Sequence, residues 1–228
     1  MNSGVLVDLG KMEYLKAWDV QRRIGQALFQ NQIPDVLLLV EHPPVYTLGK
    51  GAHGSYQNLV WDEAKRAQEG ITFVEVDRGG DITYHGPGQL VGYPILNLTR
   101  YGRDLHQYLR NLEEALIRAL GDFGITAGRF PPNTGVWVGD EKIAAIGVKA
   151  SRWITQHGFA LNVAPNLEHF SGIIPCGIQD KGVTSMEKVL GKHVTLDEVK
   201  PIVVQHLSSV FQIDFDPVSL SSLIDYAS

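Results

Sequence analysis

The chain mixes strand-like and helix-like segments without a regular alternation, and this order is what most limits the folds open to it. Apolar runs typical of strands occupy residues 5–9, 36–40, 71–76, 92–98 and 158–163. Helices are predicted at residues 12–30, 61–68 and 104–120. A doubly wound parallel sheet requires strands and helices to alternate regularly. The pattern therefore predicts an α+β fold.

The clearest helix is predicted at residues 104–120, where leucines recur at helical spacing and Gly121 is the expected stop. Beyond it, two apolar runs flank Gly139-Asp140, a pattern typical of a β-hairpin. Lys142 then lies where the second strand of this hairpin begins.

A further helix is predicted to open with a capping box. Thr195 and Glu198 have the spacing of this motif, and the helix is expected to end at about Val210. Pro201 lies too deep for an uninterrupted helix from Thr195, because proline lacks the N–H that an interior position donates. We therefore expect a kink at Pro201 or a later start.

Length and composition favour one ordinary globular domain. The chain has 228 residues, 44% hydrophobic and 20% charged, and residues 1–228 are expected to form a single domain with a core at about 5–210. A single cysteine excludes an internal disulfide and a cysteine-based zinc cluster. The net charge of −5 argues against general nucleic-acid binding.

The sequence also predicts where the protein resides. The longest strongly apolar run, residues 36–40, is far shorter than the ~20 residues that span a bilayer. The first residues lack the basic and apolar stretches of a signal peptide. We therefore expect a cytoplasmic protein with no membrane partner. A monomer is favoured, because no strongly apolar exposed face can be identified.

The lone cysteine, Cys176, lies in residues 171–179, where Pro175 and Gly177 on either side are incompatible with a regular helix or a central strand. A lone cysteine is often a small buried hydrophobe, but an irregular loop can also present a nucleophile. Thiol chemistry needs a group that lowers a pKa near 8.5. The candidates for that group are Lys142, Lys149, Lys181, His85 and His157.

A glycine-rich segment, residues 78–89, combines backbone freedom with interleaved Arg, Asp, Thr, Tyr and His side chains. It suits either a tight turn or a loop that approaches a ligand closely. No Gly-Lys-Ser/Thr follows, and the dinucleotide fingerprint is absent, which argues against ATP and NAD. The eight histidines show no metal-ligand spacing, so no metal is expected.

Residues 142–163 contain Lys142, Lys149 and Arg152 and no acidic residue, whereas residues 211–228 contain three aspartates and no basic residue. Such a basic segment is either an ordinary solvated face or a docking edge for an acidic carrier protein.

Three segments in order, residues 78–89, 142–163 and 174–178, together resemble the lipoyl(octanoyl) transferases of the biotin/lipoate protein ligase superfamily. The resemblance extends from about residue 5 to residue 210. It implies the catalytic-domain fold of that superfamily, a mixed β-sheet flanked by helices. It also implies that no metal, ATP or other cofactor is needed.

The resemblance assigns roles to individual residues. Cys176 would be the nucleophile that holds the octanoyl group as a thioester, and Lys142 would lower its pKa and transfer protons. The residues implied to line the acyl site are Arg78, Gly79, Gly80, Asp81, Ile82, Thr83, Tyr84, His85, Ala145, Ile146, Gly147, Gly158, Phe159 and Ala160.

The activity implied is octanoyl transfer from octanoyl-acyl carrier protein to a lysine of a lipoyl domain, the first step of endogenous protein lipoylation. The acceptors would be the E2 subunits of 2-oxoacid dehydrogenases and the glycine-cleavage carrier protein. Four alternatives stay open. They are an ATP-dependent lipoate–protein ligase on the same fold, a carrier-to-carrier amidotransferase or octanoyltransferase of another lineage, a non-catalytic binding module, and a cysteine hydrolase using Cys176 and His85.

Overall fold

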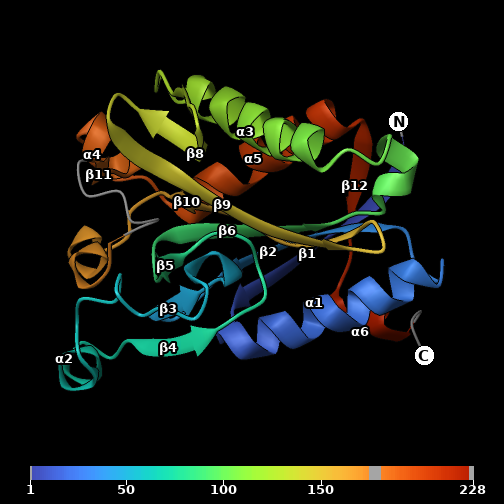
Figure 1. Cartoon of the computed structure of the whole chain (residues 1–228). Helices are drawn as coiled ribbons and strands as arrows, with labels where there is room; N and C mark the ends of the chain where they lie inside the picture. Colours follow the sequence, from blue (N-terminus) through green and yellow to red (C-terminus); the bar gives the residue numbers. More distant parts are fainter. Residues whose placement is uncertain (1, 175–180, 226–228) are drawn as a thin grey trace.

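The computed structural model in Figure 1 describes residues 2–174 and 181–225. The strands are β1 (Asn2–Lys11), β2 (Asp35–Glu41), β3 (Val45–Leu48), β4 (Thr72–Glu75), β5 (Ile82–His85), β6 (Gln89–Ile95), β7 (Gly128–Phe130), β8 (Asn133–Val138), β9 (Glu141–Ser151), β10 (Ile154–Asn162), β11 (Gly182–Val183) and β12 (Ile213–Pro217). The helices are α1 (Tyr14–Phe29), α2 (Glu63–Gln68), α3 (Leu105–Asp122), α4 (Met186–Leu190), α5 (Leu196–Phe211) and α6 (Leu220–Asp225). Short 3₁₀ turns are η1 (Lys50–Ala52), η2 (Leu98–Tyr101) and η3 (Leu167–Gly172).

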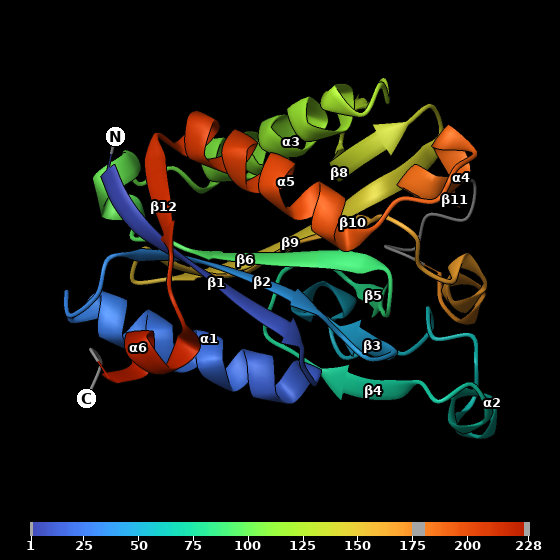
Figure 2. The same cartoon turned by 180° about the vertical axis from the view of Figure 1, so that it is seen from behind.

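A large mixed sheet forms the centre of the molecule, with strand order β12-β1-β2-β6-β10-β9-β8-β7 and with β11 paired to β9. Strand β1 runs parallel to β2 and β12, whereas β6, β10 and β9 pair antiparallel. Figures 1 and 2 show α3 and α5 on one face of this sheet and α1 and α6 on the other. The predicted α+β fold, a mixed sheet flanked by helices, is confirmed.

A smaller sheet, β4-β3-β5, lies beside the large one and has its own buried cluster. Strand β5 falls inside the glycine-rich segment 78–89 and was not predicted, and neither were β3 and β12. These strands are four or five residues long, too short for a two-residue periodicity to be recognised. No helix in residues 2–174 and 181–225 is long and apolar enough to cross a membrane.

Helix α3 begins after Asp104, whose side chain accepts a hydrogen bond from the Gln107 amide, and its leucines pack into the core cluster, Leu112, Leu116 and Leu120 fully and Leu105 and Leu109 partly buried. It does not stop at Gly121, because glycine retains its N–H and tolerates helical angles. The helix continues to Asp122, and the chain turns at Gly124, where φ is +79°.

Helix α5 begins with the predicted capping box, in which Thr195 and Glu198 exchange hydrogen bonds. The predicted later start is wrong, because the helix begins at Leu196 and includes Pro201. Proline at this position removes the hydrogen bond to the carbonyl of Asp197, and Asp197 is exposed, so water can replace the missing donor.

Helix α1 packs its predicted face, Tyr14, Ala17, Ile24 and Leu28, against the opposite side of the sheet. Gln21 lies on the same face and is fully buried. A buried amide requires hydrogen-bond partners, and here the Gln21 Oε1 atom accepts from the backbone N–H of His157 at 2.7 Å. This contact links α1 to the site described next.

Candidate active site

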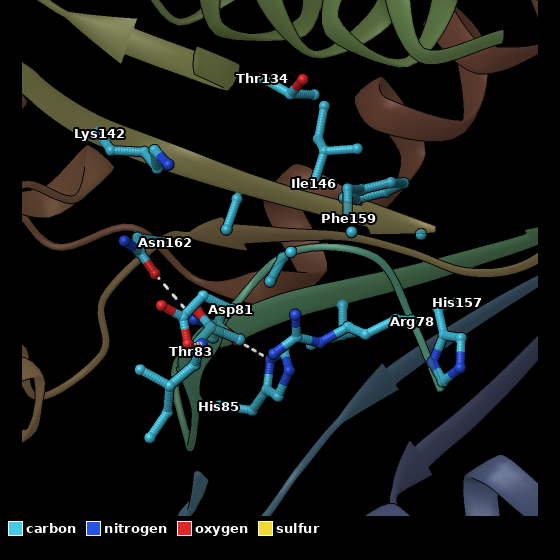
Figure 3. Close-up of a pocket in the computed structure, with 18 of the residues that line it drawn as sticks. Arg78, Asp81, Thr83, His85, Thr134, Lys142, Ile146, His157, Phe159 and Asn162 are labelled. Atoms are coloured by element: carbon cyan, nitrogen blue, oxygen red, sulfur yellow. Dashed lines mark hydrogen bonds between the residues drawn. The ribbon is translucent and has the colours of Figure 1, made fainter. Parts of the chain in front are cut away.

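The residues predicted to line an acyl site converge on one pocket, apart from Gly79 and Tyr84. Figure 3 shows this pocket between β9–β10 and the segment that carries Arg78, Asp81, Thr83 and His85. Further lining residues that were not predicted are Tyr14, Gln89, Val91, Tyr93, Thr134, Asn162, Phe170 and Val183. They come from separate elements of the chain, so no local motif identifies them.

Strand register brings the two predicted segments of β9 and β10 together. Ala145 pairs with Ala160, and Gly147 pairs with Gly158. The segment before β5 crosses this hairpin, because the Gly79 N–H donates to the Val148 carbonyl at 2.9 Å. A Cβ on Gly147 would lie 2.9 Å from the Gly79 carbonyl oxygen, so the close approach depends on glycine.

Gly79 and Tyr84 lie outside the pocket wall for different reasons. Gly79 is exposed on the crossing segment. Tyr84 alternates to the other side of β5, where its hydroxyl lies 2.8 Å from His169 Nδ1 and its ring packs edge-on against Phe170. Tyr84 therefore supports the small sheet behind the pocket.

Lys142 lines one end of the pocket, at the second residue of β9, as the hairpin pattern predicted. It is only 8% exposed, and its Nζ lies 4.8 Å from the centre of the Trp137 ring. Gly135 on the neighbouring strand has a φ of +133°, and a Cβ there would lie 3.4 Å from Lys142 Cε. A lysine is seldom buried this deeply without a specific role or partner.

Cys176 lies outside the described residues, but the chain is described on both sides of it. On one side, the Ile174 N–H donates to the Asn58 carbonyl at 2.8 Å, and nearby Phe170 lines the pocket. On the other side, Val183 lines the pocket and pairs with Lys142. Both described flanks of residues 175–180 therefore reach the pocket.

The five candidate partners of the thiol occupy different surroundings. Lys142, His85 and His157 line the pocket. Lys149 instead forms an ion pair with Asp77 at 2.5 Å, and Lys181 forms one with Asp140. Because Lys142 is buried and Lys149 is paired, the basic residues of segment 142–163 do not form one exposed edge. This differs from the interpretation of the segment as a docking edge for an acidic carrier protein.

A directed chain of hydrogen bonds begins at His85. Burial holds the pKa of His85 well below its usual value, so the ring is neutral. Its Nδ1 donates to Gln89 Oε1 at 2.8 Å, because the Gln89 amide nitrogen donates elsewhere, to Asn162 Oδ1 at 2.9 Å. Asn162 Nδ2 then donates to the Thr184 carbonyl at 3.0 Å. This chain ties β5 to the residue that follows β11.

The same chain extends to the glycine-rich segment. Arg78 donates to the carbonyl of Thr47 at 2.6 Å and to its Oγ1 at 2.9 Å. Thr47 Oγ1 lies 3.5 Å from His85 Nε2, the ring nitrogen left as an acceptor. Every member of the network is buried, so the side chains of Arg78 and His85 are held in one arrangement.

Comparison with known proteins agrees with this geometry. Residues 13–208 match the family model described as the lipoyl protein ligase A/B catalytic domain. Curated relatives named octanoyltransferase include those of Cytophaga hutchinsonii (45% identity; 94% of this chain, 96% of the relative), Solibacter usitatus (48%; 95% and 97%) and Gloeobacter violaceus (46%; 98% and 97%).

Solved structures agree on the fold. A lipoate-protein ligase A bound with ATP superposes with a TM-score of 0.74 at 18% identity, covering 99% of this chain and 96% of the ligase. A biotin protein ligase from Aquifex aeolicus gives 0.52 at 17% identity, covering 93% and 70%. The family model and the curated relatives together show that the chain belongs to the lipoyl protein ligase A/B catalytic-domain family and, within it, to the octanoyltransferases.

Proposed function

We propose that the chain transfers an octanoyl group from octanoyl-acyl carrier protein, through a thioester on Cys176, to the lysine amine of a lipoyl domain. The observation that carries the proposal is the buried Lys142 at one end of a pocket whose wall includes the small and apolar residues of β9 and β10. The names of relatives that match along nearly the whole chain support the same activity. We propose that residues 1–228 act as one catalytic domain.

In the first displacement, the Cys176 sulfur attacks the carbonyl carbon of the donor thioester, and the carrier thiolate leaves. Lys142 accepts the thiol proton of Cys176 and returns it to the departing carrier thiolate. An ammonium next to a thiolate lowers the thiol pKa, which raises the nucleophile concentration at neutral pH. One thioester replaces another, so no energy source is required.

In the second displacement, the acceptor lysine amine attacks the acyl-Cys176 carbonyl, an amide forms and the C–S bond breaks. The attacking amine must lose its proton, and in this proposal neutral Lys142 accepts it and returns it to the Cys176 thiolate. The acceptors are lipoyl domains, which we take to be those of the dehydrogenase E2 subunits and the glycine-cleavage carrier. Amide formation from a thioester is downhill, so this step also proceeds without ATP.

The ATP-dependent ligase is the second candidate. The solved structures that include lipoate-protein ligase A are less than 20% identical and share only the fold. The curated octanoyltransferases are 45–48% identical, and a ligase that forms an acyl-adenylate has no need of a thiol nucleophile. A cysteine hydrolase using His85 is disfavoured, since both ring nitrogens of His85 face Gln89 and Thr47.

The test is intact-mass spectrometry after mixing the protein with octanoyl-acyl carrier protein and no ATP. A gain of one octanoyl group, about 126 Da, that hydroxylamine removes is expected for an acyl-thioester intermediate. Cys176→Ala is expected to show no adduct. Absence of both adduct and transfer to a lipoyl domain, together with ATP-dependent use of free octanoate, would replace the proposal with the ligase.

A further inference from the structure

Polar side chains line the end of the pocket remote from Lys142. Figure 3 shows Lys142 and His157 on opposite sides, with the Lys142 amine directed into the pocket. His157 pairs with Val148 in the hairpin, six residues along β9 from Lys142, which corresponds to about 20 Å of strand. The Lys142 side chain and the imidazole each take up part of this length. The remainder is comparable with an extended octanoyl chain, about 9 Å.

The wall of the pocket changes in character along this length. Between the two ends, Val91, Ala145, Gly147 and Ala160 offer surfaces that suit methylene groups, beside the side chain of Arg78. At the far end, His157 is accompanied by the phenol groups of Tyr14 and Tyr93.

The backbone of His157 is strained. Its φ is +58° within β10, a conformation that disfavours side chains other than glycine. Its N–H bonds to Gln21 of α1 at 2.7 Å, and the residue is only 1% exposed. Strain of this kind persists where the surrounding structure demands one side-chain position.

The imidazole of His157 is held from both sides. Its Nε2 lies 2.8 Å from Asp77 Oδ1, and Nδ1 lies 3.3 Å from the Tyr14 hydroxyl. Burial lowers the pKa of His157, so the neutral ring donates Nε2–H to Asp77 and accepts the Tyr14 proton at Nδ1. Lys149 holds the other oxygen of Asp77 at 2.5 Å, so the carboxylate is fixed as well.

Tyr93 is fixed by a second histidine. His42 Nδ1 lies 2.7 Å from the Met12 carbonyl and must donate to it, and burial lowers the pKa of His42 to about 4. The neutral ring therefore accepts the Tyr93 proton at Nε2, at 2.7 Å. The hydroxyl protons of Tyr14 and Tyr93 are thus both engaged in hydrogen bonds. The terminal methyl group of a longer acyl chain would have to break these bonds, and it could not replace them.

We propose that His157, held by Asp77, Tyr14 and Gln21, closes the acyl pocket and sets its chain-length limit. This rests on the proposed function, which assigns the acyl group to this pocket. His157 is a specificity-determining residue in this scheme, since it contacts the far end of the chain and takes no part in the bond changes.

The test compares His157→Gly and His157→Ala with the wild type across hexanoyl to tetradecanoyl carrier protein, reading kcat/KM for transfer to a lipoyl domain. Glycine suits the φ of +58°, so His157→Gly removes the ring and the strain together. One methylene in an apolar pocket changes specificity by about 10- to 200-fold. The decanoyl-to-octanoyl ratio is therefore expected to rise at least about 10-fold in both variants.

A matched control is His206→Ala. His206 on α5 has the same kind of bond to an aspartate, Nε2 to Asp122 Oδ2 at 2.8 Å, far from the pocket. Its chain-length profile is expected to equal that of the wild type. If both His157 variants fail to fold, Tyr14→Phe takes their place, because it removes only the hydroxyl that holds the His157 ring. The ratio of kcat/KM for decanoyl to octanoyl transfer is then expected to rise in Tyr14→Phe.

The outcomes separate the two proposals. Folded His157 variants, or failing them Tyr14→Phe, that retain the wild-type chain-length profile overturn the limit but leave octanoyl transfer intact. A wild-type protein that transfers no acyl group of any length overturns the proposed function itself.

Discussion

The two ends of the pocket are built in different ways. At the Lys142 end, Gly135, Trp137 and Lys142 belong to one hairpin, and β11 adds Val183. At the His157 end, the wall depends on partners from three places: α1, the segment that precedes β5, and strand β6. The Tyr14–His157 hydrogen bond alone joins residues 143 positions apart. The Lys142 end is thus built mainly by one hairpin and the short strand paired with it, whereas the His157 end exists only in the assembled fold. Substitutions at the first end should alter chemistry, and those at the second should alter selectivity or stability.

The largest effect is expected from Lys142→Ala. In the proposed mechanism this group both lowers the thiol pKa and transfers protons, so its loss should reduce kcat/KM by about 10²–10⁴-fold with the fold intact. Circular dichroism would verify folding. Lys188→Ala is the control, since Lys188 is exposed and pairs with Glu141, the residue next to Lys142. Equal activity of the two variants would remove Lys142 from the mechanism.

The buried histidines at and near the His157 end should make stability depend on pH. The pKa of His42 falls from 6.5 to about 4 on folding, so between these values the unfolded chain binds a proton that the folded chain does not. The free energy of unfolding should therefore fall as the pH is lowered through this window, by on the order of 3 kcal/mol from this residue. Burial lowers the pKa of His85 and His157 too, so they act in the same direction.

Urea unfolding at pH 7 and pH 4.5 measures this loss, with His42→Gln as the comparison. Glutamine does not titrate in this range, so the variant should lose less stability between the two pH values than the wild type. An equal loss in both proteins would contradict the neutral state of His42 and, with it, the donor role of Tyr93.

A smaller effect is expected from Asn162→Leu, which interrupts the hydrogen-bond chain from His85 to Thr184. The Thr184 carbonyl and the Gln89 amide would lose a buried partner, at a cost of about 1–3 kcal/mol for such a group. Chemical denaturation would measure it. Asn111→Leu is the control, since Asn111 is only half-buried on α3 and its bond from Gln107 Nε2 is open to solvent; it should change stability much less.

The smallest effects distinguish two glycines. Gly147→Ala would bring a Cβ within 2.9 Å of the Gly79 carbonyl, and overpacking of this kind costs about 1–3 kcal/mol. Gly121→Ala meets no atom within 4 Å in α3 and should stabilise the protein by about 0.5–1 kcal/mol. Thermal unfolding should show a lower melting temperature for Gly147→Ala and a higher one for Gly121→Ala. Shifts of the same sign in both variants would disprove the tight crossing at Gly147.

Sequence patterns predicted much of the fold and part of the candidate site. The helices at 12–30 and 104–120, the Gly139-Asp140 hairpin and the capping box at Thr195 are all present. Short strands such as β3 and β5 were missed because four residues carry too little periodicity, and because their pairing is with distant segments. The end of α3 was misplaced at Gly121, since glycine marks a helix end only where the backbone requires a positive φ.

By itself, the sequence determined the α+β class, the position of Lys142 at the start of a strand, and the glycines that allow close backbone approach. These properties depend on spacing and on residue type within a few positions. Only the tertiary structure decided that Tyr14, Tyr93 and His157 line one pocket, and that Gln89 and Asn162 connect its walls. The physical reason is that a buried polar group is defined by its hydrogen-bond partners, and here those partners come from strands and helices far apart in the chain.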